Sequence, residues 1–198
     1  MSKAYSEDER NAKKNALMEA AVSLFHESGA KSLNIRELTR RAGISQGGFY
    51  TFWEDKDALI IDVIRYRARQ KLDIIESRFD DSLSDPRGFL GDHLYEWCID
   101  MKSKINEKPL YKESLKLLQR RSADETSRIA VVYQDFLTDL CDHWIKNKAV
   151  RSVDRDGLIN LFSAAGVLLT DHIQIDDDYF NVLLQAMING ALEKFIIV

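Results

Sequence analysis

Four polar side chains between residues 34 and 56 have types and spacing suited to contacting nucleic acid. Gln46 offers a hydrogen-bond donor and an acceptor together, which matches the edge of adenine. Arg36 can reach a phosphate or a guanine edge, and the hydroxyl of Tyr50 suits a phosphate oxygen. Lys56 stands where a helix is expected to begin, and backbone amides at that place also attract anions. Each could be an ordinary surface residue, but the set in register favours DNA binding.

Two short helices joined by a tight turn are predicted to position these side chains. Asn34 can cap the first helix, and Glu37 can bond back to the amide of the cap. Gly43 is the expected left-handed stop, and Ser45 can cap the second helix. The apolar residues at matching spacing are Ile35, Leu38 and Ala42 in the first helix, Ile44 buried in the turn, and Phe49, Phe52 and Trp53 in the second helix. This pattern predicts a helix-turn-helix, whose second helix enters the major groove.

Two adjacent glycines, Gly47 and Gly48, lie at the start of the second helix. Each costs a helix about 1 kcal/mol relative to alanine, and a sequence tolerates this where a bare backbone must approach something closely. The residues predicted to contact DNA are Arg36, Ser45, Gln46, Gly47, Gly48, Tyr50, Thr51 and Lys56.

The stretch resembles the N-terminal DNA-binding domain of TetR-type transcriptional regulators over about residues 10 to 65. The matching positions are Ile35, Arg36, Ala42-Gly43-Ile44-Ser45, Gly47-Gly48, Phe49-Tyr50, Phe52-Trp53 and Lys56 to Leu59. The resemblance implies an all-α fold of about nine helices, with a three-helix helix-turn-helix domain at residues 1–56 and a helical effector-binding and dimerisation domain at residues 57–198. A connecting helix is expected at residues 55–79.

The same resemblance implies a homodimeric, ligand-responsive regulator. It would be a repressor, released from a pseudo-palindromic operator in double-stranded DNA by a small apolar or aromatic effector. Four positions depart from the family pattern. Gly48 stands where the family often has a small hydroxyl residue, and Thr51 stands where it often has a histidine or an aromatic residue. Glu54 and Asp55 place two carboxylates beside a phosphate, which weakens binding.

Composition indicates a soluble helical protein with a weakly basic N-terminal part. Only 2 Pro and 9 Gly occur among 198 residues, which favours long uninterrupted helices. The net charge is −4, but residues 1–78 hold 14 basic and 12 acidic side chains, whereas residues 79–198 hold 14 and 20. DNA binding should therefore depend on a few placed cations and weaken with salt. The polar N-terminus, the two distant cysteines and the lack of a long apolar run predict a cytoplasmic protein without signal peptide or membrane span.

Helical periodicity continues through the remaining chain, with a boundary expected at residues 80–85 and no strand pattern. The expected helices are 9–28 before the motif and, after the connecting helix, 86–105, 109–121, 123–148, 155–175 and 178–196. The last two are apolar nearly all round, which predicts a four-helix interface between two subunits. The predicted interface residues are Leu161, Ala165, Leu168, His172, Phe180, Leu184 and Met187.

Aromatic side chains are abundant in the middle helices, where their ordinary role is core packing. The resemblance places an effector pocket there, and its predicted lining is His93, Trp97, Tyr111, Tyr133, Phe136 and Trp144. Asp-His pairs occur at 92–93, 142–143 and 171–172, but neighbours on a helix do not face each other. No metal site, cofactor or catalytic activity is therefore expected. Two alternatives stay open: a DNA-binding regulator without a small-molecule effector, switched by a protein or acting as an activator, and a helical enzyme or metal-binding bundle.

Overall fold

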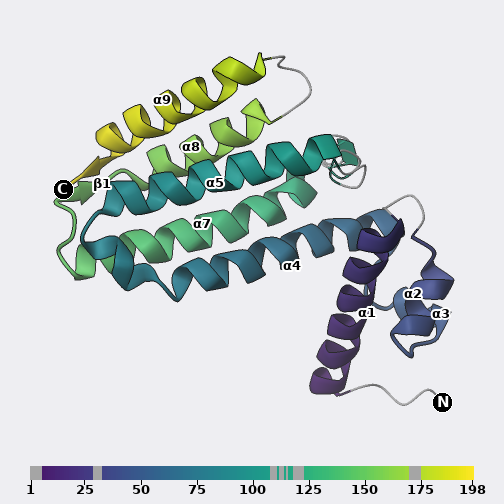
Figure 1. The fold of residues 1–198 in the computed structure, drawn as a ribbon. Helices are drawn as coiled ribbons and strands as arrows, with labels where there is room; N and C mark the ends of the chain where they lie inside the picture. Colours follow the sequence, from purple (N-terminus) through teal and green to yellow (C-terminus); the bar gives the residue numbers. More distant parts are fainter. Residues whose placement is uncertain are drawn as a thin grey trace. The chain divides into compact units, whose positions relative to one another are not determined.

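The computed structural model describes residues 6–28, 33–107, 123–169 and 175–198, together with Tyr111, Ser114, Lys116 and Leu117. These residues include eight α-helices, a short 3-10 helix and a small two-stranded sheet (Figure 1). The all-α class is therefore confirmed. The chain forms two compact units, the first from residues 1–67 and 107–126, the second from residues 68–106 and 127–198.

The first unit contains α1 (Glu7–Ser28), α2 (Ile35–Arg41), α3 (Gln46–Phe49) and the first half of α4 (Lys56–Glu76). These elements share one apolar core, because each turns a stripe of large side chains inward. The core residues include Leu17, Ala21, Leu24, Phe25, Leu38, Phe49, Trp53, Leu59, Ile60 and Val63. A four-residue helix has almost no stability of its own, so α3 depends on the burial of Phe49 in this core.

The second helix of the motif is shorter than its apolar spacing predicts. It ends at Phe49, and Phe52 and Trp53 lie in the turn that follows. Trp53 is buried, and its indole Nε1 donates a hydrogen bond to Oδ2 of Asp62 on α4 at 3.0 Å. The regular spacing of these aromatic residues therefore reflects a shared core rather than one continuous helix.

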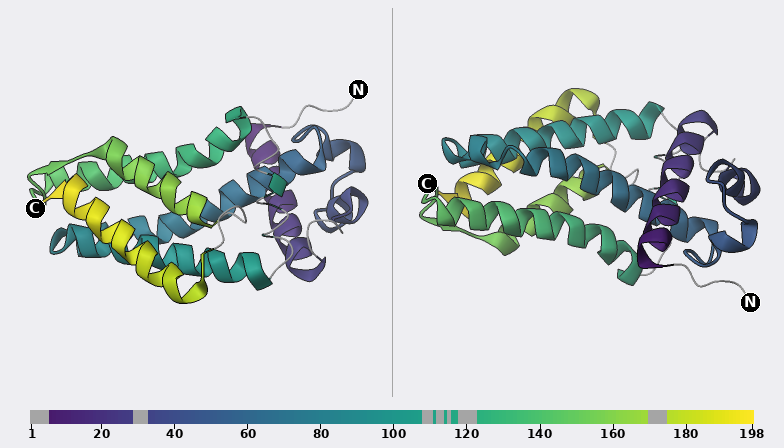
Figure 2. Two further views of the ribbon diagram at one scale, coloured as in Figure 1. Left: turned by 90° about the horizontal axis from the view of Figure 1, so that it is seen from above. Right: turned by 90° about the horizontal axis from the view of Figure 1, so that it is seen from below.

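The second unit is a helical bundle formed by the second half of α4, a 3-10 helix (Phe79–Leu83), α5 (Pro86–Glu107), most of α7 (Ala123–Lys146), α8 (Arg155–Leu168) and α9 (Asp177–Phe195). Helices α8 and α9 lie side by side (Figure 1 and Figure 2). Helix α5 begins with Pro86 and is capped by Asp85, whose Oδ1 accepts a hydrogen bond from the backbone N–H of Gly88 at 3.0 Å. Large side chains fill the bundle, among them Leu90, Leu94, Phe136, Leu140, Trp144, Leu158 and Leu184.

A short antiparallel strand pair, which the sequence pattern does not predict, joins two distant segments of the second unit. Strand β1 (Ser152–Val153) pairs with β2 (Ile196–Ile197). The guanidinium Nε of Arg87 on α5 donates a hydrogen bond to the carbonyl oxygen of Ile196 at 2.8 Å. Two-residue strands are too short to show the alternation from which strands are predicted.

Several helix ends also differ from the predicted ones. Helix α4 ends at Glu76, before the expected 79, and a 3-10 helix occupies most of the predicted boundary at 80–85. Helix α8 ends at Leu168 rather than near 175. Most of the helix expected at 109–121 lies outside the described residues.

Candidate nucleic-acid interface

Local hydrogen bonds define where α2 begins and ends. The side chain of Asn34 caps the helix, because its Oδ1 accepts a hydrogen bond from the backbone N–H of Arg36 at 2.8 Å. The chain then turns through Gly43, whose φ of +66° lies in the left-handed region that favours glycine. The backbone N–H of Ile44 donates to the carbonyl oxygen of Thr39 at 2.9 Å and closes the turn. Both expectations are confirmed, although Ile44 is half-buried rather than buried.

The tip of the motif, defined here as residues 45–51, presents polar groups on a buried anchor. Oγ of Ser45 accepts a hydrogen bond from the backbone N–H of Gly48 at 3.2 Å, which confirms the predicted cap. Phe49 is fully buried, whereas Gln46 is exposed and Tyr50 is 55% exposed. The hydroxyl of Thr51 is exposed and donates to the carbonyl oxygen of Gly48 at 2.7 Å. The tip therefore holds an amide, a phenol and a hydroxyl outward on a fixed backbone.

The two glycines of the tip have different surroundings. A Cβ on Gly47 would meet no atom within 4 Å, and Gly47 has no left-handed φ. A Cβ on Gly48 would stand 2.6 Å from Cγ2 of Ile44. Packing inside the motif therefore explains Gly48, which corrects the expectation that both glycines serve approach to another molecule. Nothing in the fold explains Gly47.

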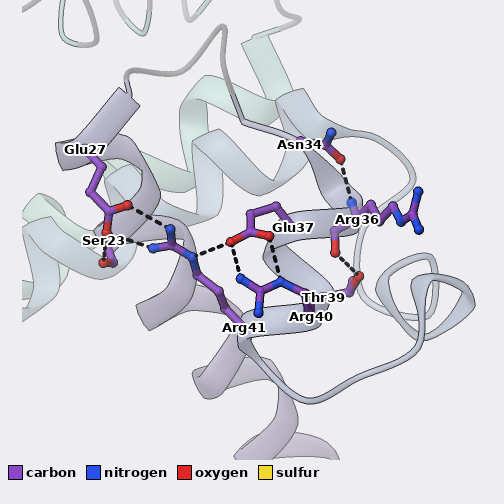
Figure 3. A network of polar contacts seen from close by, with 8 residues as sticks. All are labelled: Ser23, Glu27, Asn34, Arg36, Glu37, Thr39, Arg40 and Arg41. Carbon is purple, nitrogen blue, oxygen red and sulfur yellow. Dashed lines mark hydrogen bonds and ion pairs between the residues drawn. The ribbon is translucent and has the colours of Figure 1, made fainter.

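Arginine and glutamate side chains form a network of ion pairs that connects the C-terminal end of α1 with α2 (Figure 3). The guanidinium of Arg41 donates two hydrogen bonds to the carboxylate of Glu27 on α1, at 2.7 and 2.8 Å, and a third to Glu37 at 2.9 Å. Arg40 donates two more to Glu37, at 2.7 and 2.8 Å. The hydrogen bonds from Arg41 lower the pKa of Glu27 to about 2, and those from Arg40 and Arg41 do the same for Glu37. Glu37 is therefore an ion-pair partner, where the sequence predicted a capping role.

Arg36 lies outside this network, with its guanidinium directed away from both carboxylates (Figure 3). Of the three arginines of α2, all of which the structure describes, it is the one without an acidic partner. Lys56 is the first residue of α4, and Oδ1 of Asp55 caps this helix by accepting a hydrogen bond from the N–H of Ala58 at 2.7 Å. Asp55 thus caps the helix that begins at Lys56.

Asp62 on α4 connects three parts of the first unit and was not identified from the sequence. Besides the hydrogen bond from Trp53, its carboxylate pairs with Nζ of Lys14 at 3.0 Å and with Arg65 at 3.2 Å. Burial opposes ionisation, but the hydrogen bonds from Trp53 and Lys14 outweigh it and lower the pKa of Asp62. The i, i+4 spacing of Glu37 and Arg41 could have indicated the other network, whereas nothing local indicated Asp62.

Most residues predicted for the effector site lie in the second unit. Trp97 and Tyr133 are half-buried with ring centroids 5.9 Å apart, and burial raises the pKa of Tyr133 to about 12. His93 stacks edge-on to Phe89, and burial lowers its pKa. Phe136 and Trp144 are fully buried core residues, and Tyr111 belongs to the first unit.

A groove in the second unit lies between α5 and α9. Its lining is Arg87, Gly88, Gly91, Asp92, Tyr95, Gln185, Ile188, Asn189, Leu192 and Glu193. None of the predicted effector residues belongs to it.

The predicted subunit interface needs correction. Leu161, Ala165, Phe180 and Leu184 are at most 4% exposed and pack inside the protomer, so their side chains are not available to a second subunit. Leu168 and Met187 are half-buried, and His172 lies outside the described residues. The large apolar side chains that are exposed on the same helices are Val167, Tyr179, Val182 and Leu183, which are 50–65% exposed.

The histidine pairs do not assemble a metal site in the described part of the chain. Nε2 of His143 lies 3.1 Å from Asp80, while its neighbour Asp142 pairs with Arg155. Among the residues described, no three His, Cys, Asp or Glu side chains group in a way that could hold a metal ion. None of the described helices combines the length and apolarity needed to span a bilayer.

Comparison with known proteins places the motif among bacterial regulators. Residues 17–63 match the family described as bacterial regulatory proteins, tetR family. YuxN of Bacillus subtilis, an uncharacterised HTH-type transcriptional regulator, is 32% identical over 54 residues, which cover 27% of this chain and 19% of that protein. The chain thus spans about a fifth of the length of this relative.

The whole fold is similar to solved structures with low sequence identity. RolR, solved in complex with the ligand resorcinol, matches with a TM-score of 0.64 and 16% identity over 98% of this chain and 92% of that one. SmeT, the repressor of the multidrug efflux pump SmeDEF of Stenotrophomonas maltophilia, matches with a TM-score of 0.52 and 15% identity over 92% and 90%.

Proposed function

Because residues 17–63 match the tetR family of bacterial regulatory proteins, we propose that the chain is a transcriptional regulator of this family, which represses transcription as a homodimer on a pseudo-palindromic operator and leaves the DNA when a small effector binds. The observation that carries this proposal is the tip at residues 45–51. It combines a capped, core-anchored backbone with outward Gln46 and Tyr50. A helix-turn-helix needs this combination in order to read a major groove.

The residues of the motif then have different roles in DNA binding. Gln46 reads a base edge, and its amide suits adenine. Arg36, Tyr50 and Lys56 contact the backbone phosphates. Gly47 lets the peptide backbone approach the DNA where a side chain would hold it away.

The proposed dimer uses the exposed apolar residues of α8 and α9. Val167, Tyr179, Val182 and Leu183 are large side chains that a monomer would leave in water. Covering them with the same face of a second subunit removes this apolar surface in a twofold arrangement. Such a dimer presents two motifs to half-sites about one turn or a turn and a half apart.

The proposed effector is a small apolar or aromatic molecule bound in the second unit near Trp97 and Tyr133. These half-buried aromatic residues combine apolar surface with polar tips. The structural neighbour RolR was solved with resorcinol, a small aromatic diol, which supports this class of ligand. Helix α4 begins in the first unit and ends in the second. If α4 has two positions that differ in DNA affinity, a ligand that binds more tightly to one of them changes the affinity for DNA.

Selection from a random duplex library, followed by fluorescence anisotropy, tests the proposal. Tyr50→Ala is expected to weaken binding to all sequences, whereas Gln46→Ala relaxes preference at one base position. Equal losses for Gln46→Ala on selected and random DNA would remove Gln46 from base reading. Addition of resorcinol and related phenols to the bound complex tests release, and failure of the whole panel to release DNA would contradict the proposed effector class.

A further inference from the structure

We propose that Arg41 is a positioning residue, which holds α2 against the end of α1 and does not itself contact DNA. This inference rests on the proposed DNA-binding function. It assigns different roles to the three arginines of α2, which composition alone would treat as equivalent phosphate contacts.

The geometry of the Arg41 guanidinium supports a positioning role. It donates to both carboxylate oxygens of Glu27 and uses its remaining Nε for Glu37, so one planar group joins two helices (Figure 3). Paired hydrogen bonds of this kind fix orientation as well as distance. Ser23 adds a further bond to Glu27, from Oγ at 2.9 Å, and so orients the carboxylate that receives Arg41.

Charge compensation in the network leads to the same conclusion. Two carboxylates face the two guanidinium groups of Arg40 and Arg41, which leaves little net positive charge to attract phosphates. A phosphate that recruited Arg41 would have to replace two carboxylate hydrogen bonds on Glu27. Arg36 has no such competitor and lies on the other side of α2 from the network (Figure 3).

Variants at the two ends of the ion pair distinguish positioning from DNA contact. If Arg41 positions α2, Arg41→Gln and Glu27→Gln each weaken operator binding about two- to fivefold, the range of a good exposed ion pair. The double variant then loses no more than either single one. If Arg41 contacts phosphate instead, Glu27→Gln releases it and binding becomes tighter. Glu7→Gln, on an exposed residue of the same helix, controls for the loss of one negative charge.

The salt dependence of binding gives an independent readout. Arg36→Gln should lower the slope of log affinity against log salt by about 0.9 per bound protomer. Arg41→Gln should leave this slope and the affinity for random duplex unchanged, because only the fit to the operator is lost. A general loss of folding would reduce both affinities and would appear in circular dichroism.

A slope reduced by Arg41→Gln as much as by Arg36→Gln, or tighter binding of Glu27→Gln, would overturn the inference. Wild-type protein that selects no DNA sequence would instead refute the proposed function. Because the wild-type control is measured first, the two failures can be told apart.

Discussion

Replacing Gly47 by alanine should make the protein more stable and a worse DNA binder. The added Cβ meets no atom within 4 Å, and the backbone is not left-handed. The free energy of unfolding should therefore increase by the difference in helix propensity between alanine and glycine, up to about 1 kcal/mol. At a close contact with DNA the same methyl group has no room. Overpacking of this kind costs about 1–3 kcal/mol, which corresponds to about 5- to 150-fold weaker binding.

Gly48 provides the matched control, because the same methyl group would meet the protein itself. The Cβ added at residue 48 would stand 2.6 Å from Cγ2 of Ile44. This methyl group is bonded to the branched Cβ of Ile44, so it cannot move without rotation of the whole isoleucine side chain. Gly48→Ala should therefore lower the free energy of unfolding, by about 1–3 kcal/mol before the propensity gain is counted. One methyl group at neighbouring positions thus has opposite effects on stability.

The assay combines urea unfolding, monitored by circular dichroism, with anisotropy on a selected operator duplex. The expected pattern is a higher unfolding midpoint and weaker DNA binding for Gly47→Ala, and a lower midpoint for Gly48→Ala. Wild-type affinity in the more stable Gly47→Ala variant would refute close approach at this residue. A lower midpoint for Gly47→Ala would show that an internal contact, and not DNA, requires glycine there.

Two further predictions concern the second unit. Leu183→Glu should yield a folded monomer in light scattering, because Leu183 is exposed. Leu184→Glu, in contrast, should unfold the chain, since Leu184 is fully buried. A Leu183→Glu variant that is still a dimer would contradict the proposed interface. Burial and the carboxylate of Asp73 raise the pKa of Glu76 despite Arg69, so its ionisation costs stability as pH rises through the folded-state pKa. Glu76→Gln should therefore raise the melting temperature at pH 7 and lose this gain near pH 4; a gain equal at both pH values would count against the assignment.

Local chemistry made the motif predictable from sequence. The side chains of Asn34 and Ser45 accept hydrogen bonds from backbone amides two or three residues further on, and the left-handed φ at position 43 favours glycine. These features depend only on neighbouring residues, so the sequence of the motif is sufficient to predict them. The all-α class follows equally from long helical periodicity. The predicted end of α3 was wrong, because Phe52 and Trp53 pack with the apolar core of the first unit from the turn that follows the helix.

Tertiary packing explains why several residues predicted for the subunit interface and the effector site are buried in the core of the second unit instead. Helices α8 and α9 are apolar on several sides, and sequence alone does not say which side faces the protomer's own core. The structure places Leu161 and Leu184 in that core and leaves Val182 and Leu183 exposed. Similarly, aromatic content suggested Trp144 for the effector site, but its indole N–H donates to Oγ of Ser82 at 2.7 Å inside the core.

The most direct test of the proposed function is to determine the DNA sequence that the intact protein selects, together with the number of protomers bound to it. We expect two half-sites related by twofold symmetry, occupied by two protomers, with sequence preference at one position of each half-site lost in Gln46→Ala. Library selection that enriches no sequence, or binding of one protomer to an asymmetric site, would contradict it.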